Sequence, residues 1–106
     1  MNLFNLEKNK VVVNAPALTI KDFKALWSRD TSKTKEKAIK EFSYIYFLVD
    51  WNSVYQSIAE DERHDMLKED LDLGDTWEPD HLVIQAKKRY EELQETATMK
   101  YARSVR

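Results

Sequence analysis

Residues 33–50, KTKEKAIKEFSYIYFLVD, decide the fold that we expect for this chain. In their first half, Ala38, Phe42 and Ile45 recur at intervals of three and four residues, while the lysines fall on the opposite face. This periodicity is typical of a helix. The second half, residues 44–49, is apolar on every side and, taken alone, could also form a buried strand. Because no helix breaker separates the two halves, we predict one helix over about residues 33–50.

The apolar half of this helix needs to be covered. A helix without a polar face is normally enclosed on all sides. The chain has 106 residues, which is enough for one domain and too few for two, so few other helices can enclose it. We therefore expect either that the tyrosine hydroxyls of this segment reach the surface or that a partner covers part of it.

A shorter helix is predicted over about residues 20–28. Thr19 and Asp22 resemble a capping box at its start. Its inward face is expected to consist of Ile20, Phe23, Leu26 and Trp27. The polar cluster 30–32, Asp-Thr-Ser, comes next. Its carboxylate and hydroxyls can accept hydrogen bonds from the first free amides of the following helix, so we expect this cluster to cap it.

A third helix is predicted after a turn at residues 50–53. Ser57 and Glu60 match the S-x-x-E capping box, which predicts a helix from about Ile58. Its buried side is expected to consist of Met66, Leu67 and Leu71. Gly74 follows the last apolar residues of this pattern, where a left-handed C-terminal cap is needed, and we expect it to serve as that cap.

The last helix is predicted to be the longest, from about His81 to past Lys100. Asp80 follows a proline and is expected to cap the start of this helix. Apolar residues recur at threes and fours, namely Leu82, Val83, Ala86, Tyr90, Leu93 and Ala97. We expect a helix of this length to project beyond a small core.

The N-terminal segment is predicted to contain one short strand. Residues 10–13, KVVV, contain three consecutive β-branched valines and are followed by Asn14 and Pro16. We find no second β-rich run that could pair with this strand, so it is expected to lie on the helices or to add to the sheet edge of another subunit. The predicted fold class is therefore mostly α: an extended N-terminal arm over residues 1–18 with one short β-strand, and a small four-helix domain over residues 19–106.

Composition excludes several classes of function. The chain has no cysteine, which excludes disulfides, thiolate catalysis and cysteine-bound metals. Its single glycine, Gly74, excludes the glycine-rich loops that bind phosphates. No apolar run approaches the roughly 18 residues of a membrane span, and the start of the chain lacks the basic and apolar stretches of a signal peptide. We expect a soluble protein that is neither secreted nor inserted in a membrane.

Charge is unevenly distributed along the chain, although the formal net charge is only −2. Residues 21–41 hold seven Lys and Arg against four Asp and Glu, and residues 60–80 hold two against ten. Residues 81–106 are basic again, with six against three. Such segregation either coats the solvent faces of helices or lets copies of one protein meet head to tail through complementary fields.

No constellation of residues points to catalysis or to a metal. The third predicted helix clusters Glu60, Asp61, His64, Asp65 and Glu69. A carboxylate-bridged di-metal site needs such a motif on two helices, so we interpret this cluster as a solvated face. Asp50 is the one carboxylate in an apolar context, and we interpret it as a turn residue. We expect no catalytic residue, no metal and no cofactor, and hence not an enzyme.

Nucleic-acid binding is an alternative that the basic stretch suggests. The residues that could contact phosphates are Lys21, Lys24, Arg29, Lys33, Lys35, Lys37 and Lys40. A dedicated nucleic-acid-binding domain is usually basic as a whole, and this chain is not. We therefore prefer protein partners.

Four stretches carry a resemblance to a known group of proteins: residues 26–30 (LWSRD), 31–38 (TSKTKEKA), 44–55 (YIYFLVDWNSVY) and 90–96 (YEELQET). Together they resemble small virion-associated proteins of large tailed bacteriophages, crAss-like phages among them. The resemblance covers most of residues 20–100 and rests on the overall pattern, without a diagnostic motif. It implies a subunit of the head, neck or tail that assembles in a ring or on a larger virion protein, and hence a protein of the virion or of the host cytoplasm. It implies no catalytic residues.

These observations predict a structural assembly protein that works through protein–protein contacts. The residues expected at interfaces are Val11, Val12, Val13, Arg29, Lys33, Tyr44, Tyr46 and Trp51. The valines would add a strand, the aromatic residues would anchor, and the two cations would pair with charges. Two alternatives remain open: a small phage-encoded regulator or inhibitor that docks on a host protein, and a nucleic-acid accessory protein that uses residues 21–40.

Overall fold

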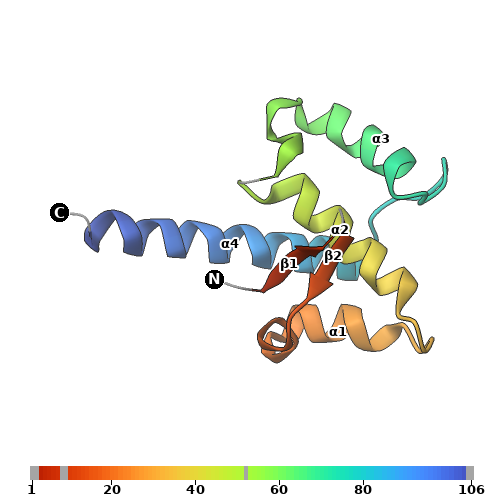
Figure 1. Ribbon diagram of the computed structural model, residues 1–106, viewed down its shortest axis with the longest axis horizontal. Helices are drawn as coiled ribbons and strands as arrows, with labels where there is room; N and C mark the ends of the chain where they lie inside the picture. Colours follow the sequence, from red (N-terminus) through yellow and green to blue (C-terminus); the bar gives the residue numbers. More distant parts are fainter. Residues whose placement is uncertain (1–2, 8–9, 52, 105–106) are drawn as a thin grey trace.

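The computed structural model describes residues 3–7, 10–51 and 53–104. Within these residues the chain folds into four α-helices preceded by a two-stranded hairpin, which confirms the mostly α, four-helix prediction (Figure 1). The elements are β1 (Phe4–Glu7), β2 (Lys10–Val13), the 3-10 helix η1 (Ala15–Thr19), α1 (Lys21–Arg29), α2 (Glu36–Val49), the 3-10 helix η2 (Val54–Ser57), α3 (Glu60–Asp70) and α4 (His81–Ser104).

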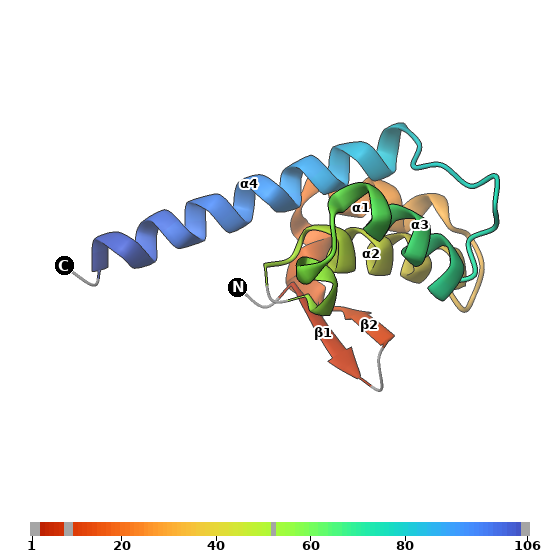
Figure 2. The same ribbon diagram turned by 90° about the horizontal axis from the view of Figure 1, so that it is seen from above.

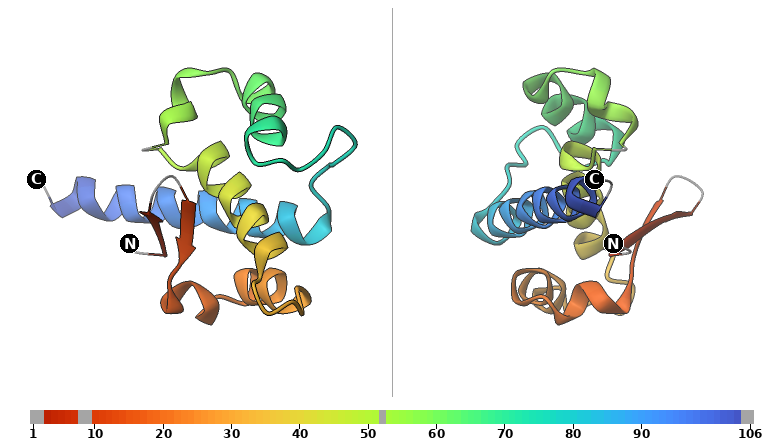
Figure 3. Two further views of the ribbon diagram at one scale, coloured as in Figure 1. Left: turned by 45° about the vertical axis from the view of Figure 1, so that its right-hand side comes forward. Right: turned by 90° about the vertical axis from the view of Figure 1, so that its left-hand side faces the viewer.

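The centre of the molecule is α2, which contacts α1, α3, α4 and β2. Phe42 and Ile45 are fully buried, and in the apolar segment 44–49 only Tyr46 remains half-buried. Figures 1 and 3 show α3 and α1 on opposite sides of the layer that α2 and α4 form. The helix prediction for this segment is confirmed. The chain's own helices and hairpin enclose this segment except at the half-buried Tyr46, so in this conformation no partner is required to cover it.

The N-terminal strand has a partner within its own chain, contrary to the prediction. β1 pairs antiparallel with β2 in the register Phe4↔Val13 and Leu6↔Val11. Figure 3 shows the two strands beside α2, which β2 contacts. The missed signal is the alternation of Phe4 and Leu6 with polar residues, a period of two in a stretch without β-branched residues. Phe4 and Val11 are buried in the core, so this segment is a packed hairpin and not an extended arm.

Neither predicted capping box forms. The hydroxyl of Thr19 donates to the carbonyl of Pro16, and α1 begins after Ile20 without a side-chain cap. Ser57 ends η2, so that Ala59 occupies the N-cap position of α3 and Glu60 is its first residue. A capping box needs its glutamate three residues after the cap. The 3-10 helix takes up the residues that would have formed that first turn.

The C-terminal cap of α3 is two residues earlier than predicted. Asp72 adopts the left-handed conformation with φ 55°, and the amide of Leu73 donates to the carbonyl of Lys68 at 2.9 Å, which is the Schellman pattern. Gly74, with φ 99°, serves the next turn, in which its carbonyl accepts from Trp77. The buried side of α3 also differs from the prediction, because Leu67 is fully buried and Met66 is 41% exposed.

The last helix, α4, confirms the predicted length and projection. Its first half packs against α1 and α2 and buries Val83, Ala86 and Tyr90. Asp80 caps its start by accepting from the amide of Val83 at 3.2 Å. Figure 2 shows that its second half continues past every other element and gives the molecule its long axis, 46 Å against 31 and 28 Å. Among the described residues, no helix combines the length and the apolar character of a membrane span.

Candidate interaction surface

Arg29, predicted as a basic contact for a partner, is used inside the molecule. It lies at the end of α1, where its guanidinium pairs with Glu41 on α2 and with Asp80 before α4, the latter at 2.6 Å. The Glu41 side chain is only 3% exposed. Burial raises the pKa of the Glu41 carboxyl, and the Arg29 charge opposes that rise. Arg29 therefore joins three helices and is not a free basic contact.

The start of α2 is held by the predicted polar cluster. One oxygen of the Asp30 carboxylate accepts from the amide of Ala38 at 2.9 Å, and the other accepts from the amide and hydroxyl of Ser32. Lys35 adopts the left-handed conformation, with φ 53°, and its ammonium donates to the carbonyls of Trp27 and Asp30. The predicted cap is confirmed. The turn that it requires delays the start of the helix from residue 33 to Glu36.

Replacing Asp30 with asparagine is expected to destabilise the protein in a pH-dependent way. The hydrogen bond from the Ala38 amide, with those from Ser32, lowers the pKa of Asp30 from 3.8 to about 2. A carboxyl group whose pKa is lower in the folded than in the unfolded protein stabilises the fold when the pH is above its unfolded pKa. This stabilisation is lost as the pH falls through its folded pKa. The loss in free energy of unfolding of Asp30→Asn, relative to the native protein, should therefore be full at neutral pH and should shrink between pH 3.8 and about 2.

Urea unfolding followed by circular dichroism over this pH range measures that deficit. Asp65→Asn is the matched control, because Asp65 is exposed on α3 beyond the first turn of that helix, and its side chain has no hydrogen bond or ion pair to another described residue. A deficit that stays constant as the pH falls would contradict the assignment of Asp30 as the cap.

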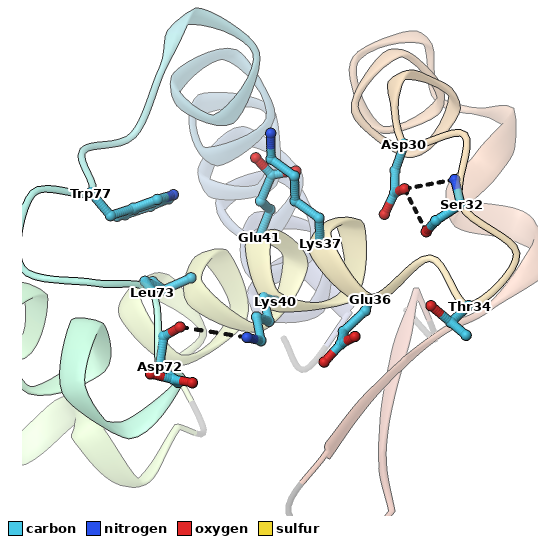
Figure 4. A pocket seen from close by; sticks show the side chains of 10 residues that line it. All are labelled: Asp30, Ser32, Thr34, Glu36, Lys37, Lys40, Glu41, Asp72, Leu73 and Trp77. Atoms are coloured by element: carbon cyan, nitrogen blue, oxygen red, sulfur yellow. Dashed lines mark hydrogen bonds between the residues drawn. The ribbon is translucent and has the colours of Figure 1, made fainter.

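A pocket of about 510 Å³ opens beside this junction, between the first turns of α2 and the loop after α3. Figure 4 shows its lining, in which Lys37 and Lys40 stand among the carboxylates of Glu36, Glu41 and Asp72. One wall is the indole of Trp77. Charges of both signs alternate around the pocket, so it presents no field of one sign to a ligand.

Tyr44, predicted as an aromatic anchor for a partner, anchors α3 instead. Its hydroxyl lies 2.8 Å from Nδ1 of His64, and Nε2 of His64 lies 3.4 Å from the Glu78 carboxylate. The ring of Trp77 packs against Tyr44 with 4.8 Å between centroids. Burial raises the pKa of Tyr44 to about 12. His64 is engaged at both ring nitrogens, and no three described His, Asp or Glu residues are arranged to hold a metal ion.

The remaining predicted interface residues differ in accessibility. Val11 is 2% exposed and lies in the core, so its side chain cannot reach another protein in this conformation. Val12 is 37% exposed and Val13 is half-buried. Lys33 is exposed, and so is Trp51 at 51%. Of the eight candidates, the structure thus leaves Val12, Lys33 and Trp51 on the surface. Val13, Tyr46 and the ion-paired Arg29 are partly accessible.

Some cations of the basic stretch, residues 21–40, are bonded within the molecule. Lys35 bonds to backbone carbonyls, and Lys40 lies 3.4 Å from the carbonyl of Asp72. The exposed cations that remain are Lys21, Lys24, Lys33 and Lys37.

An acidic groove is the feature that the sequence reasoning did not identify. It has a volume of about 420 Å³ and lies along the last turns of α3 and the loop that follows. Its lining consists of Asp65, Lys68, Glu69, Asp72, Gly74 and Asp75. The sequence signal was the acidic excess of residues 60–80, but the spacing alone could not show that these carboxylates share one hollow.

A second surface lies where α4 leaves the core. Gln94 fixes this point, because its amide donates to the carbonyl of Val49 at 2.9 Å and accepts from the amide of Trp51 at 3.0 Å. The hydroxyl of Tyr90 donates to Asp50 one turn earlier. Beside this anchor, Trp51 and the 79% exposed Val54 place apolar surface in solvent.

Comparisons with protein-family models, with curated proteins and with solved structures find no match to this chain.

Proposed function

We propose that this protein is a non-enzymatic assembly subunit and that the projecting half of α4 is its principal contact with other proteins. The observation that carries the proposal is the length of α4. A helix of 24 residues spans about 36 Å at 1.5 Å per residue. Its last anchors to the core, among the residues whose side chains are described, are Tyr90 and Gln94.

A helical segment of this kind is marginally stable on its own. Isolated helices shorter than about 12–15 residues are only partly formed in water, and most helical stability in proteins comes from packing of an apolar face. Positions 93, 97 and 101 hold Leu, Ala and Tyr at helical spacing. This spacing continues that of Val83, Ala86 and Tyr90, which are buried. The sequence of α4 thus keeps the apolar spacing of a packed helix beyond its last described anchor, Gln94, which supports a role for this segment in binding another chain.

Glutamates at positions 97 and 101 are expected to prevent this assembly without unfolding the core. We expect the native protein to give the mass of an oligomer in size-exclusion chromatography with light scattering, and Ala97→Glu/Tyr101→Glu to give the mass of a monomer. The control Gln85→Glu/Lys88→Glu places two glutamates at exposed positions on the packed half of the same helix. A control that also dissociates, or a native protein that is strictly monomeric, would contradict self-assembly through α4.

The resemblance to tailed-phage proteins supports a position in the virion, in a head, neck or tail. In such a particle, a small subunit with one protruding helix would bind copies of itself or a larger virion protein. Quantitative mass spectrometry of gradient-purified particles tests this part of the proposal. We expect the protein at a fixed ratio to the major capsid protein, and its absence from the particles would favour the alternative of a regulator that acts on a host protein.

A further inference from the structure

One edge of the hairpin has no neighbouring strand within the described part of the chain. The amide of Asn14 donates to the carbonyl of Leu3 at 2.9 Å, which makes these two residues a hydrogen-bonded pair of the antiparallel ladder. Bonded and non-bonded pairs alternate along such a ladder. The next pair, Phe4 with Val13, is therefore non-bonded, and so is the pair that Leu6 makes two residues further on. The backbone N–H and C=O groups of Phe4 and Leu6 thus point away from β2.

This outer edge of β1 lacks the features that usually protect an edge strand. Its outward backbone groups, on Phe4 and Leu6, have no hydrogen bond to another described residue. Figure 2 shows the hairpin standing out from the helices, with no other described helix or strand along the outer side of β1. Natural edges are commonly blocked by a lysine, a proline or a bulge. The sequence of β1, FNLE, contains no lysine or proline, its register with β2 is regular, and Leu6 is 49% exposed. The edge is therefore open to a further strand, which offers backbone donors and acceptors at the same spacing.

The outward groups of β1 match those of a second β1 in one antiparallel register. A hydrogen-bonded pair needs an outward-pointing residue on each strand. Placing Phe4 opposite Leu6 of the other copy, and Leu6 opposite its Phe4, satisfies the outward groups of both residues at once. Placing either residue opposite its own counterpart leaves the other without a partner inside the strand Phe4–Glu7. The favoured register is two-fold symmetric, and it sets the exposed Asn5 of the two copies face to face across the axis. It also gives the exposed Leu6 an apolar neighbour across the new ladder.

We infer that β1 pairs with β1 of a second copy of this chain, antiparallel about a two-fold axis at Asn5, so that one sheet continues across the two molecules. The contact is isologous, because both copies use the same surface. A pairing of two short strands is small beside the roughly 1,200–2,000 Å² that a stable interface buries. It therefore forms where α4 brings copies together and raises their effective concentration. In its strength the inference rests on the proposed function, whereas its geometry depends on β1 alone.

A single cysteine at position 5 tests the register. The chain has no cysteine, so a disulfide in Asn5→Cys can form only between copies. Directly opposite residues of a non-bonded pair have Cα atoms about 4.5 Å apart, a separation that a disulfide spans. The control is Val12→Cys, because Val12 is paired with Asn5 on the same face of the hairpin and is 37% exposed. In the proposed sheet it lies about 14 Å from its counterpart, since it is one strand further out on each side.

Non-reducing electrophoresis, with oxidised glutathione as the oxidant, measures the rate of cross-linking of each variant. We expect Asn5→Cys to cross-link at least about tenfold faster than Val12→Cys, because only its sulfur atoms come within bonding distance. Adding Leu6→Pro to Asn5→Cys removes an outward N–H without removing a hydrogen bond to β2. Adding Leu6→Lys instead blocks the edge as natural edge strands do. Each addition is expected to slow the cross-linking to about the rate of Val12→Cys.

Circular dichroism and thermal unfolding of each variant establish that it is folded. Equal rates for Asn5→Cys and Val12→Cys overturn the inference, and so does cross-linking that neither substitution at position 6 slows. If the native protein is an oligomer that Ala97→Glu/Tyr101→Glu dissociates, and Asn5→Cys has no advantage, the role of α4 stands and only the β1 contact is wrong. If the native protein is strictly monomeric and Asn5→Cys still cross-links faster than Val12→Cys at high concentration, the β1 contact stands and self-assembly through α4 is wrong.

Discussion

Replacing Phe4 with alanine is expected to lower the free energy of unfolding by about 3–5 kcal/mol, the usual cost of removing a buried phenylalanine ring. Phe4 is 9% exposed, and its ring centroid lies 5.8, 5.6 and 5.4 Å from those of Phe23, Phe42 and Tyr90. The substitution removes one wall of this aromatic cluster and leaves a cavity among the others. Since small domains are stable by only about 5–15 kcal/mol in total, the variant should unfold at a much lower urea concentration.

Equilibrium urea unfolding, followed by tryptophan fluorescence and circular dichroism, measures this loss. Leu6→Ala is the control, because Leu6 lies on the same strand, β1, and is 49% exposed. We expect it to cost less than about 1 kcal/mol. If Phe4→Ala instead matches the native protein, the hairpin does not belong to the core, and the first helix would be the true start of the folded unit.

Phe4 also illustrates how far the sequence predicts this fold. The helices were predictable because their apolar residues recur at threes and fours over long windows, and tertiary packing follows that period. The first strand was not predictable, because only two of its four residues, Phe4 and Leu6, are apolar. An alternation this short cannot be distinguished from chance. What makes this segment a strand is the docking of Phe4 among rings that are 19, 38 and 86 residues away along the chain. Local propensity cannot report such contacts.

The candidate surfaces were predicted less well than the helices, for a related reason. Apolar and charged residues were both candidates for contacts, but only the fold shows which of them the chain uses internally. Tyr44 is bonded to His64 within the molecule, and Arg29 is paired with Glu41 and Asp80. The carboxylates of the acidic groove come together only because the left-handed turn at Asp72 folds the loop back beside α3. The projection of α4 was predictable, since it depends only on helix length.

Arg29 provides the second large effect. Replacing it with methionine keeps an unbranched apolar stem but removes the guanidinium, and with it the charge beside Glu41, whose side chain is 3% exposed. A buried carboxylate without its partner must either stay charged at a high desolvation cost or take up a proton on folding. Breaking a buried ion pair from one side costs about 3–5 kcal/mol, and we expect the lower end because Arg29 is itself 26% exposed.

Two further measurements separate the ion pair from a general loss of packing. Arg29→Met/Glu41→Met removes both charges, and it should recover stability to within about 1 kcal/mol of the native protein, because an apolar pair of similar volume leaves no uncompensated charge. Lys24→Met on the same helix replaces an exposed lysine and should be nearly neutral.

The pH dependence of Arg29→Met gives the sharpest test of this account. Without the guanidinium, the folded pKa of Glu41 rises further above its ordinary value of 4.5. When the pKa of a carboxyl is raised in the folded state, the group binds a proton more tightly there than in the unfolded state. The free energy of unfolding lost through Glu41 is therefore greatest at neutral pH, and it shrinks as the pH falls through the raised pKa towards 4.5. The deficit of Arg29→Met should therefore narrow on mild acidification, while the double methionine variant should show no such narrowing. If Arg29→Met lowers the free energy of unfolding equally at neutral and at mildly acidic pH, Arg29 acts through packing of its aliphatic stem. In that case α1, α2 and α4 are not joined by its charge.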